Sequence, residues 1–249
     1  YLVVLNETVD SKIEVAVLDL LASSVRVGVC ETPKQLFDLF YELSPKELLT
    51  TTAVEKRDWF KNLTQVFRHA VLTLRDAYFE KPEVLEALKR YLNETQKTDL
   101  FTSHLKNPLP LWANKTMRID ATALSSLEII KSLSLEGPSL LSTIDKTKTA
   151  MGRRLLKDWL CHPLTDKEQI QNRLDAVEAI IAKSEPAKEI TDILTNVRDL
   201  ERLTTKTTLG LSMPRDLVLV RDILKKVPDL KTNLKKIKSV RLSEIEKKL

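Results

Sequence analysis

Hydrophobic residues in the first part of the chain recur at every second position in two segments. Residues 13–18 and 25–30 alternate in this way, which is typical of half-buried β-strands. Residues 2–5 form a short apolar run that suits a third strand. The two alternating segments are close enough along the chain to pair as a hairpin that turns near Ala22–Ser24.

A helix is predicted directly after these strands. Thr32 can cap the helix and Pro33 suits its first turn. Apolar residues then follow at helical spacing on one face, namely Leu36, Phe37, Phe40 and Leu43. Further strands are expected at 47–52 and 71–74, with a helix at 55–68 between them. Strands interleaved with helices predict an α/β domain over residues 1–80.

From residue 81 onward the spacing of apolar residues favours helices, so residues 81–249 are predicted to form a mainly α-helical domain. One of these helices begins at Thr149 and ends before Pro163. We interpret its apolar face, together with one residue of the next helix, as a core packing hub made of Met151, Leu155, Leu156, Trp159 and Leu174. In such a position Trp159→Ala is expected to cost about 3–5 kcal/mol through the cavity that it leaves.

The last predicted helix runs from Asp229 to the final residue and carries a stripe of lysines. Lys231, Lys235 and Lys238 are spaced i, i+4 and i+7, which places them on one helical face. Such a stripe can face the phosphates of a nucleic acid. The alternative is that these lysines form the solvent side of an amphipathic helix, and the pattern leaves both interpretations open.

Composition excludes several classes of function. The chain has 249 residues, of which 43% are hydrophobic and 30% are charged, as in soluble globular proteins. Its four glycines are scattered and form no phosphate-binding loop, so nucleotide hydrolysis is not expected within this chain. The two distant cysteines, Cys30 and Cys161, make a disulfide framework implausible and suit a reducing cytoplasm. No apolar run approaches about 18 residues, so no membrane-spanning helix is expected.

Charge is distributed unevenly along the chain. Residues 1–80 carry 9 Lys/Arg and 12 Asp/Glu, whereas residues 81–249 carry 31 and 23. The basic second part suits a polyanionic partner, although a solvated helical surface would give the same balance. Arg153 and Arg154 lie in the first turns of a predicted helix, where the dipole does not favour positive charge. We therefore expect at least one of them to pair with a carboxylate from another helix or another domain.

No catalytic, cofactor-binding or metal-binding residues are predicted. The three histidines lack other ligands at metal-binding spacing, and Cys161–His162 is interpreted as a packed thiol beside a helix end. Asp19 and Asp38 are the only acidic pair that suggests a metal-dependent nuclease, and no cluster of acids surrounds them. Because the chain begins with Tyr1 and ends inside a helical pattern, we expect it to be a piece of a longer protein.

Several motifs in the helical part resemble the core domain of the MutS family of DNA mismatch repair proteins. The most specific of them are Met117-Arg-Ile-Asp-Ala-Thr-Ala-Leu-Ser-Ser-Leu-Glu128 and Ser139-Leu-Leu-Ser-Thr-Ile-Asp-Lys-Thr-Lys-Thr-Ala-Met-Gly-Arg-Arg-Leu-Leu156. Shorter ones follow at Trp159-Leu-Cys-His-Pro-Leu164, Ile170-Gln-Asn-Arg-Leu-Asp-Ala-Val177, Val197-Arg-Asp-Leu-Glu-Arg-Leu203 and Pro214-Arg-Asp-Leu217. Residues 1–80 resemble the connector domain of that family, although Ala22-Ser23 stands where members often have Thr-Gly.

The resemblance implies a division of labour between domains. It implies an RNase H-like connector at 1–80, followed by the core and the start of the lever helices at 81–249. In this family, mismatch recognition by a Phe-x-Glu wedge and hydrolysis of ATP with Mg²⁺ belong to other domains, and neither is expected here. The connector and core relay nucleotide state to the DNA clamp, and the connector contributes to contact with a MutL-type partner. DNA and a second MutS subunit are the other implied partners, and no membrane is implied. The implied location is a bacterial cytoplasm or a eukaryotic nucleus.

Three alternatives remain open. A homologue that acts in recombination without mismatch recognition would share these motifs, and only segments outside the chain would distinguish it. A nuclease that uses the RNase H-like part is a second alternative, and a helical adaptor that binds only proteins is a third.

Overall fold

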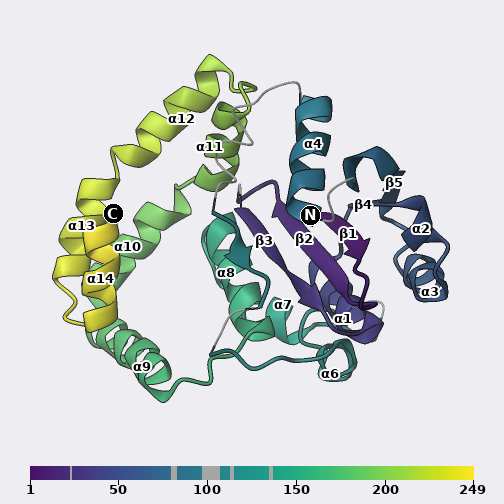
Figure 1. Ribbon diagram of the computed structural model, residues 1–249. Helices are drawn as coiled ribbons and strands as arrows, with labels where there is room; N and C mark the ends of the chain where they lie inside the picture. Colours follow the sequence, from purple (N-terminus) through teal and green to yellow (C-terminus); the bar gives the residue numbers. More distant parts are fainter. Residues whose placement is uncertain (23, 80–82, 97–106, 113–114, 135–136) are drawn as a thin grey trace. The chain divides into compact units, whose positions relative to one another are not determined.

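The computed structural model describes residues 1–249 except 23, 80–82, 97–106, 113–114 and 135–136 (Figure 1). The described residues form two compact units. The first comprises residues 1–113, 120–123 and 205–211, and the second comprises 114–119, 124–204 and 212–249. The turn residue Ser23 and the boundary predicted between residues 80 and 81 lie outside the described residues. The first unit nevertheless extends well past residue 80, so its predicted end lies too early.

The first unit is built on a six-stranded sheet with the order β5-β4-β1-β2-β3-β6. Its strands are β1 (Leu2–Glu7), β2 (Ile13–Asp19), β3 (Ser24–Cys30), β4 (Glu47–Thr50), β5 (Val71–Leu74) and β6 (Leu109–Pro110). The first three form an antiparallel meander, as the alternating pattern predicts, while β4 is parallel to β1 and β5 is parallel to β4. β6 pairs in parallel with β3 at the opposite edge.

Two helical layers cover this sheet because neighbouring residues of a strand face opposite sides. Val3 and Leu5 pack with α1 (Pro33–Leu43) and α3 (Asp58–Val66). Leu2 and Val4 pack on the other side with α4 (Val84–Gln96). α4 therefore belongs to the first unit, because its apolar face completes the core of the sheet. The remaining short helices of this part are α2 (Thr52–Glu55) and the 3-10 helix η1 (Asp76–Phe79).

Local signals in the first unit place the elements correctly, with one exception. Thr32 caps α1 by accepting a hydrogen bond from the backbone N–H of Gln35, and Pro33 is its first residue. The helix predicted over 55–68 is shorter, since α3 covers only Asp58–Val66, and the separate helix α2 precedes it and begins at the last residue of the strand predicted over 47–52. Thr51 caps α2 through the backbone N–H of Val54, so the chain makes a short helical turn before α3 begins.

Helices make up most of the second unit. They are α7 (Leu140–Ile144), α8 (Ala150–Cys161), α9 (Lys167–Ala182), α10 (Ser184–Thr195), α12 (Pro214–Leu224), α13 (Val227–Lys235) and α14 (Val240–Lys248). Two further helices, α6 (Ala121–Ser126) and α11 (Leu200–Thr208), contribute residues to both units. The buried cluster of this unit consists of Ala176, Leu234, Ile237 and Leu242.

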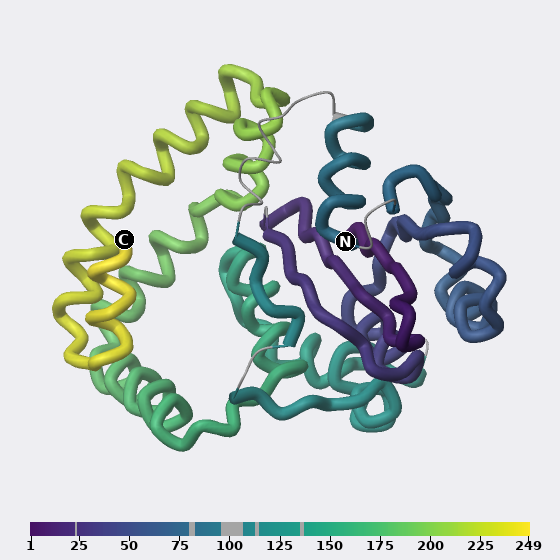
Figure 2. The backbone as a smooth tube through the Cα atoms, viewed as in Figure 1, coloured from purple at the N-terminus to yellow at the C-terminus, as the bar shows by residue number. Residues whose placement is uncertain are grey.

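The prediction of one last helix from Asp229 to the end of the chain is wrong. The chain reverses between α13 and α14, the yellow segment of Figure 2, and these two helices contact each other. In a straight helix Leu242 would lie about 12 Å along the axis from Leu234. The reversal instead brings both leucines into one cluster with Ala176 of α9.

The predicted packing hub is not buried in this structure. Leu155, Trp159 and Leu174 are 51%, 38% and 56% exposed, and Met151 and Leu156 are half-buried. Helical spacing identified a common apolar face, but spacing alone does not say what covers a face. In the second unit α8 packs mainly on the short helix α7, and the burial of α9 is concentrated at Ala176 instead of Leu174.

Candidate functional site

Arg154 forms an ion-pair site with two carboxylates in the second unit. Thr149 caps α8 by accepting from the backbone N–H of Gly152 at 3.0 Å, which starts the helix so that Arg154 lies in its second turn. The guanidinium of Arg154 donates to both oxygens of Asp199, from Nη1 at 2.9 Å and from Nη2 at 2.8 Å. Its Nε and Nη2 also donate to Oε2 of Glu201, at 3.1 and 2.5 Å.

The ion pair between Arg154 and Asp199 shifts the pKa values of these two groups. Hydrogen bonding from Arg154 holds the pKa of Asp199 below its usual value, and the same hydrogen bonds raise the pKa of Arg154. Asp199 also accepts from the backbone N–H of Arg202 at 3.3 Å in the first turn of α11. Arg154 therefore joins the start of α8 to the start of α11, and the prediction of a carboxylate partner from another helix is confirmed.

A second cationic site joins α8 to α9. The guanidinium carbon of Arg173 lies 3.8 Å from the centroid of the Trp159 ring, which is the geometry of a cation–π contact. Burial is the main reason why the pKa of Arg173 is lowered, and the nearby charge of Arg241 lowers it further.

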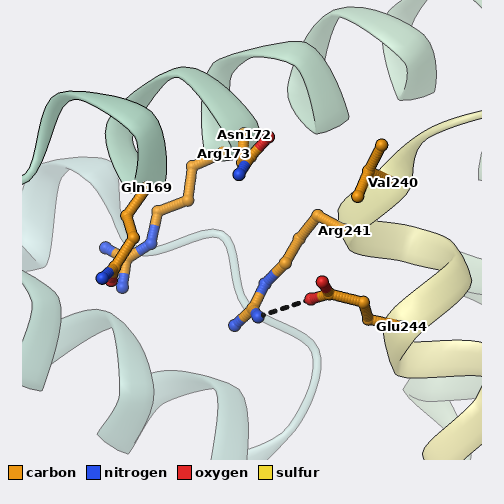
Figure 3. A pocket seen from close by; sticks show the side chains of 6 residues that line it. All are labelled: Gln169, Asn172, Arg173, Val240, Arg241 and Glu244. Carbon is orange, nitrogen blue, oxygen red and sulfur yellow. Dashed lines mark hydrogen bonds and ion pairs between the residues drawn. The ribbon is translucent and has the colours of Figure 1, made fainter.

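A cavity of about 170 Å³ lies between α9 and α14. Figure 3 shows Arg173 on α9 and Arg241 on α14 among the side chains that line it. Nη1 of Arg241 donates to Oε2 of Glu244 at 3.2 Å. The cavity is lined by Gln169, Asn172, Arg173, Val240, Arg241 and Glu244.

Comparison with known proteins identifies the family of the part of the chain that contains these sites. Residues 122–249, just over half of the chain, match the model of MutS domain III. The chain belongs to the MutS family. Both cationic sites and the cavity therefore lie within the MutS domain III region.

Individual relatives extend the match to the first unit. A DNA mismatch repair protein MutS of Caldanaerobacter subterraneus is 34% identical over 248 residues, which cover 88% of this chain and 28% of that protein. The protein of the same name from Desulforamulus reducens is 32% identical over 279 residues and covers 98% of this chain. That alignment covers 32% of the relative, so the chain spans about a third or less of these MutS proteins.

The lysine stripe expected on the last predicted helix does not form as a single face. Lys231 and Lys235 lie on α13, whereas Lys238 follows the end of that helix because the chain reverses there. Nζ of Lys235 lies 3.6 Å from Oε1 of Glu246 on α14. The three lysines therefore do not present the regular row that a continuous helix would offer to phosphates.

The carboxylates considered for a nuclease have structural roles. Asp19 accepts hydrogen bonds from the backbone N–H groups of Leu21 and Ala22 after β2. Asp38 on α1 accepts from the backbone N–H of Ala121 at 2.9 Å. Over the described ranges, no group of three or more His, Cys, Asp or Glu residues is placed to hold a metal ion. In the same part of the chain, no helix is both long and apolar enough to cross a membrane.

The letters of the family's mismatch wedge do occur once in this chain, contrary to the expectation from the resemblance. Phe40-Tyr41-Glu42 reads Phe-x-Glu. Phe40 is fully buried in α1 and packs edge-on against Phe67. A buried ring inside a helix cannot insert between DNA bases, so these residues belong to the core of the first unit.

Sequence patterns did not identify several residues of these sites, among them Asp199, Glu201 and Arg241. These three residues are distant in the chain from the residues that they face, and no spacing rule connects them. Arg173 lies in a recognised motif, but its stacking on Trp159 depends on the turn between α8 and α9.

The exposure of Trp159 changes what its removal should do. Because the ring is 38% exposed, Trp159→Ala is expected to lower the free energy of unfolding by about 1–2 kcal/mol, and not by the 3–5 kcal/mol expected for a core residue. Urea denaturation followed by circular dichroism measures the difference. Trp159→Phe, which keeps an aromatic face for Arg173, should recover most of the loss. A loss of 3 kcal/mol or more would contradict this expectation and indicate that Trp159 is buried in a core.

Proposed function

We propose that this chain is the connector and core part of a DNA mismatch repair protein and that it has no enzymatic activity of its own. The match of residues 122–249 to MutS domain III carries this proposal. The names and alignments of the relatives support it across nearly the whole chain. ATP and Mg²⁺ would be bound by other parts of the parent protein, since this sequence contains no phosphate-binding loop.

The first unit is proposed to be an RNase H-like connector. The strand order β3-β2-β1-β4-β5, with an antiparallel meander followed by two parallel strands, supports this assignment. Contact with a MutL-type partner is proposed for this unit, and a second MutS subunit for the parent protein. Both partners come from the resemblance to the family.

The second unit is proposed to transmit displacements between the DNA-binding and ATP-hydrolysing parts of the parent protein. Arg154 supports this role because its multiple hydrogen bonds tie the starts of two helices together. Exposed apolar residues on α8 and α9 also support it, because such a face suits packing against other protein. We propose that segments of the parent protein outside this chain cover these residues, which include Leu155 on α8 and Leu174, Val177 and Ile181 on α9.

Binding to DNA distinguishes this function from a mismatch sensor. In a gel-shift titration at low salt, the 249-residue chain is expected to bind a duplex with a G·T mismatch and a matched duplex with affinities within about twofold. Weak binding is expected to come from phosphate contacts, which carry no information about the base pair. A preference of tenfold or more for the mismatch would contradict the proposal.

The same preparation tests the nuclease alternative. Incubation of labelled duplex and single-stranded DNA with Mg²⁺ or Mn²⁺ is expected to give no cleavage above that of an Asp19→Asn variant. Metal-dependent cleavage that this substitution abolishes would instead favour a nuclease.

A further inference from the structure

The cavity between α9 and α14 contains more positive than negative charge. Arg173 and Arg241 bring two guanidinium groups to it, and Glu244 is its only carboxylate. Glu244 contacts Arg241 within one helix at i, i+3, and its side chain is 54% exposed, so this pair is weak. Two cations placed against a shared space repel each other, and an anion between them would remove that repulsion.

The neutral groups around the cavity are also suited to an anion. The amides of Gln169 and Asn172 can donate hydrogen bonds, and each arginine has a planar fork of N–H donors that matches the oxygens of phosphate. A volume of about 170 Å³ leaves room for one oxyanion with some of its water.

The start of α14 provides an independent observation at the same place. Val240 and Arg241 are the first two residues of this helix, and both line the cavity. Ser239 at the N-cap makes no side-chain capping bond, and its hydroxyl is buried without a hydrogen-bond partner among the described residues. The first turn therefore lacks the side-chain acceptor that usually satisfies its N–H groups, while its dipole favours negative charge nearby.

We propose that the cavity is a binding site for a phosphate-type oxyanion, held by Arg173 and Arg241 with the amides of Gln169 and Asn172. The ion has two sources with the same chemistry, free inorganic phosphate and a phosphodiester group of DNA. The inference rests on the geometry of the second unit alone and does not require the mismatch repair function.

Calorimetric titration of the full 249-residue chain with sodium phosphate at constant ionic strength tests the site. Saturable binding is expected for the wild type, and Arg241→Gln is expected to weaken it by about tenfold or more because a charge-assisted hydrogen bond is lost. Lys238→Gln is the matched control, since it removes one charge just before α14 from a residue that does not line the cavity. Its phosphate affinity should stay within about twofold of the wild type.

A variant with the opposite expected effect on phosphate affinity keeps the test decisive if Arg241→Gln fails to fold. Glu244→Gln removes the carboxylate from the cavity and is expected to tighten phosphate binding by about threefold. Absence of saturable phosphate binding by the wild type would overturn the site. Equal weakening by Arg241→Gln and Lys238→Gln would also overturn it, because it would indicate only general attraction to a basic surface.

Duplex DNA distinguishes the two sources. If the site takes a phosphodiester group, Arg241→Gln should weaken duplex binding more than Lys238→Gln does, and phosphate should compete with the duplex. If it takes free phosphate, the two variants should bind the duplex equally while phosphate affinity still differs between them. Both results support the oxyanion site and assign its ligand.

Discussion

Phe40→Ala is expected to destabilise the first unit by about 3–5 kcal/mol, the largest effect predicted for a single substitution in this chain. The Phe40 ring is fully buried between the sheet and α3 and lies 5.5 Å from the ring of Phe67 in an edge-on arrangement. Its removal loses both the transfer free energy of the ring and this aromatic contact, and it leaves a cavity. Urea denaturation followed by circular dichroism measures the change.

Val66→Ala provides the control for Phe40. Val66 ends α3, close in sequence to Phe67, but its side chain is 59% exposed. Its replacement is therefore expected to change the free energy of unfolding by less than about 0.5 kcal/mol. Similar losses for the two variants would mean that the first unit is not organised around the face of the sheet that α1 and α3 cover.

Arg154→Ala is expected to lower the free energy of unfolding of the second unit by about 2 kcal/mol. The substitution leaves Asp199 and Glu201 facing each other without their shared cation. Breaking a fully buried pair costs about 3–5 kcal/mol, and partial access of water to these side chains reduces that figure. Thermal unfolding of the variant and the wild type, monitored by circular dichroism, measures the loss.

The neighbouring Arg153 is a matched control for Arg154. It pairs with Asp145 at 3.0 Å, but its side chain is 66% exposed compared with 28% for Arg154. Arg153→Ala should therefore cost less than about 1 kcal/mol. Equal losses of stability in the two variants would contradict the expectation that the ion pairs of Arg154 stabilise the fold more than the ion pair of Arg153 does.

The cost of Arg154→Ala should also depend on pH. Because the folded pKa of Asp199 is lowered, its carboxylate contributes stability above the unfolded pKa of about 3.9, and this stability is lost as the pH falls through the lower folded value. The difference between the wild type and Arg154→Ala should therefore shrink below about pH 4. A difference that stays constant as the pH falls through that range would mean that Asp199 is not the main partner.

Residues proposed to transmit displacements are also residues that stabilise the second unit. A helix can carry a displacement only if its ends are held, and Arg154 holds the start of α8 against the start of α11. The oxyanion site is similar in kind, since an ion between Arg173 and Arg241 would join α9 to α14. Arg154 connects two helices that contribute nothing to the small core of Ala176, Leu234, Ile237 and Leu242, whereas the ion would add to a contact between α9 and α14 that this core already makes.

The first unit shows how much local sequence can determine. The alternation over 13–18 and 25–30 was sufficient for the meander because a half-buried strand needs one apolar side at every second residue. Thr32 and Pro33 were sufficient for the start of α1 because capping acts between residues adjacent in the chain. Motifs such as Met151-Gly-Arg-Arg-Leu-Leu156 were sufficient for the family, since a specific order of residues identifies relatives without any knowledge of contacts.

Other features depended on contacts between residues far apart in the chain. Helical spacing predicted one face for Trp159 and Leu174, but whether such a face is covered depends on which helices pack against it. The lysine stripe failed because burial of Leu234 and Leu242 in one cluster requires a reversal that no local signal marks. The pairing of Asp199 with Arg154 could not be predicted either, because the two residues lie 45 positions apart in the chain. Sequence alone thus determined the local elements and the family, whereas the tertiary structure decided exposure, ion pairing and the cavity, because those depend on long-range packing.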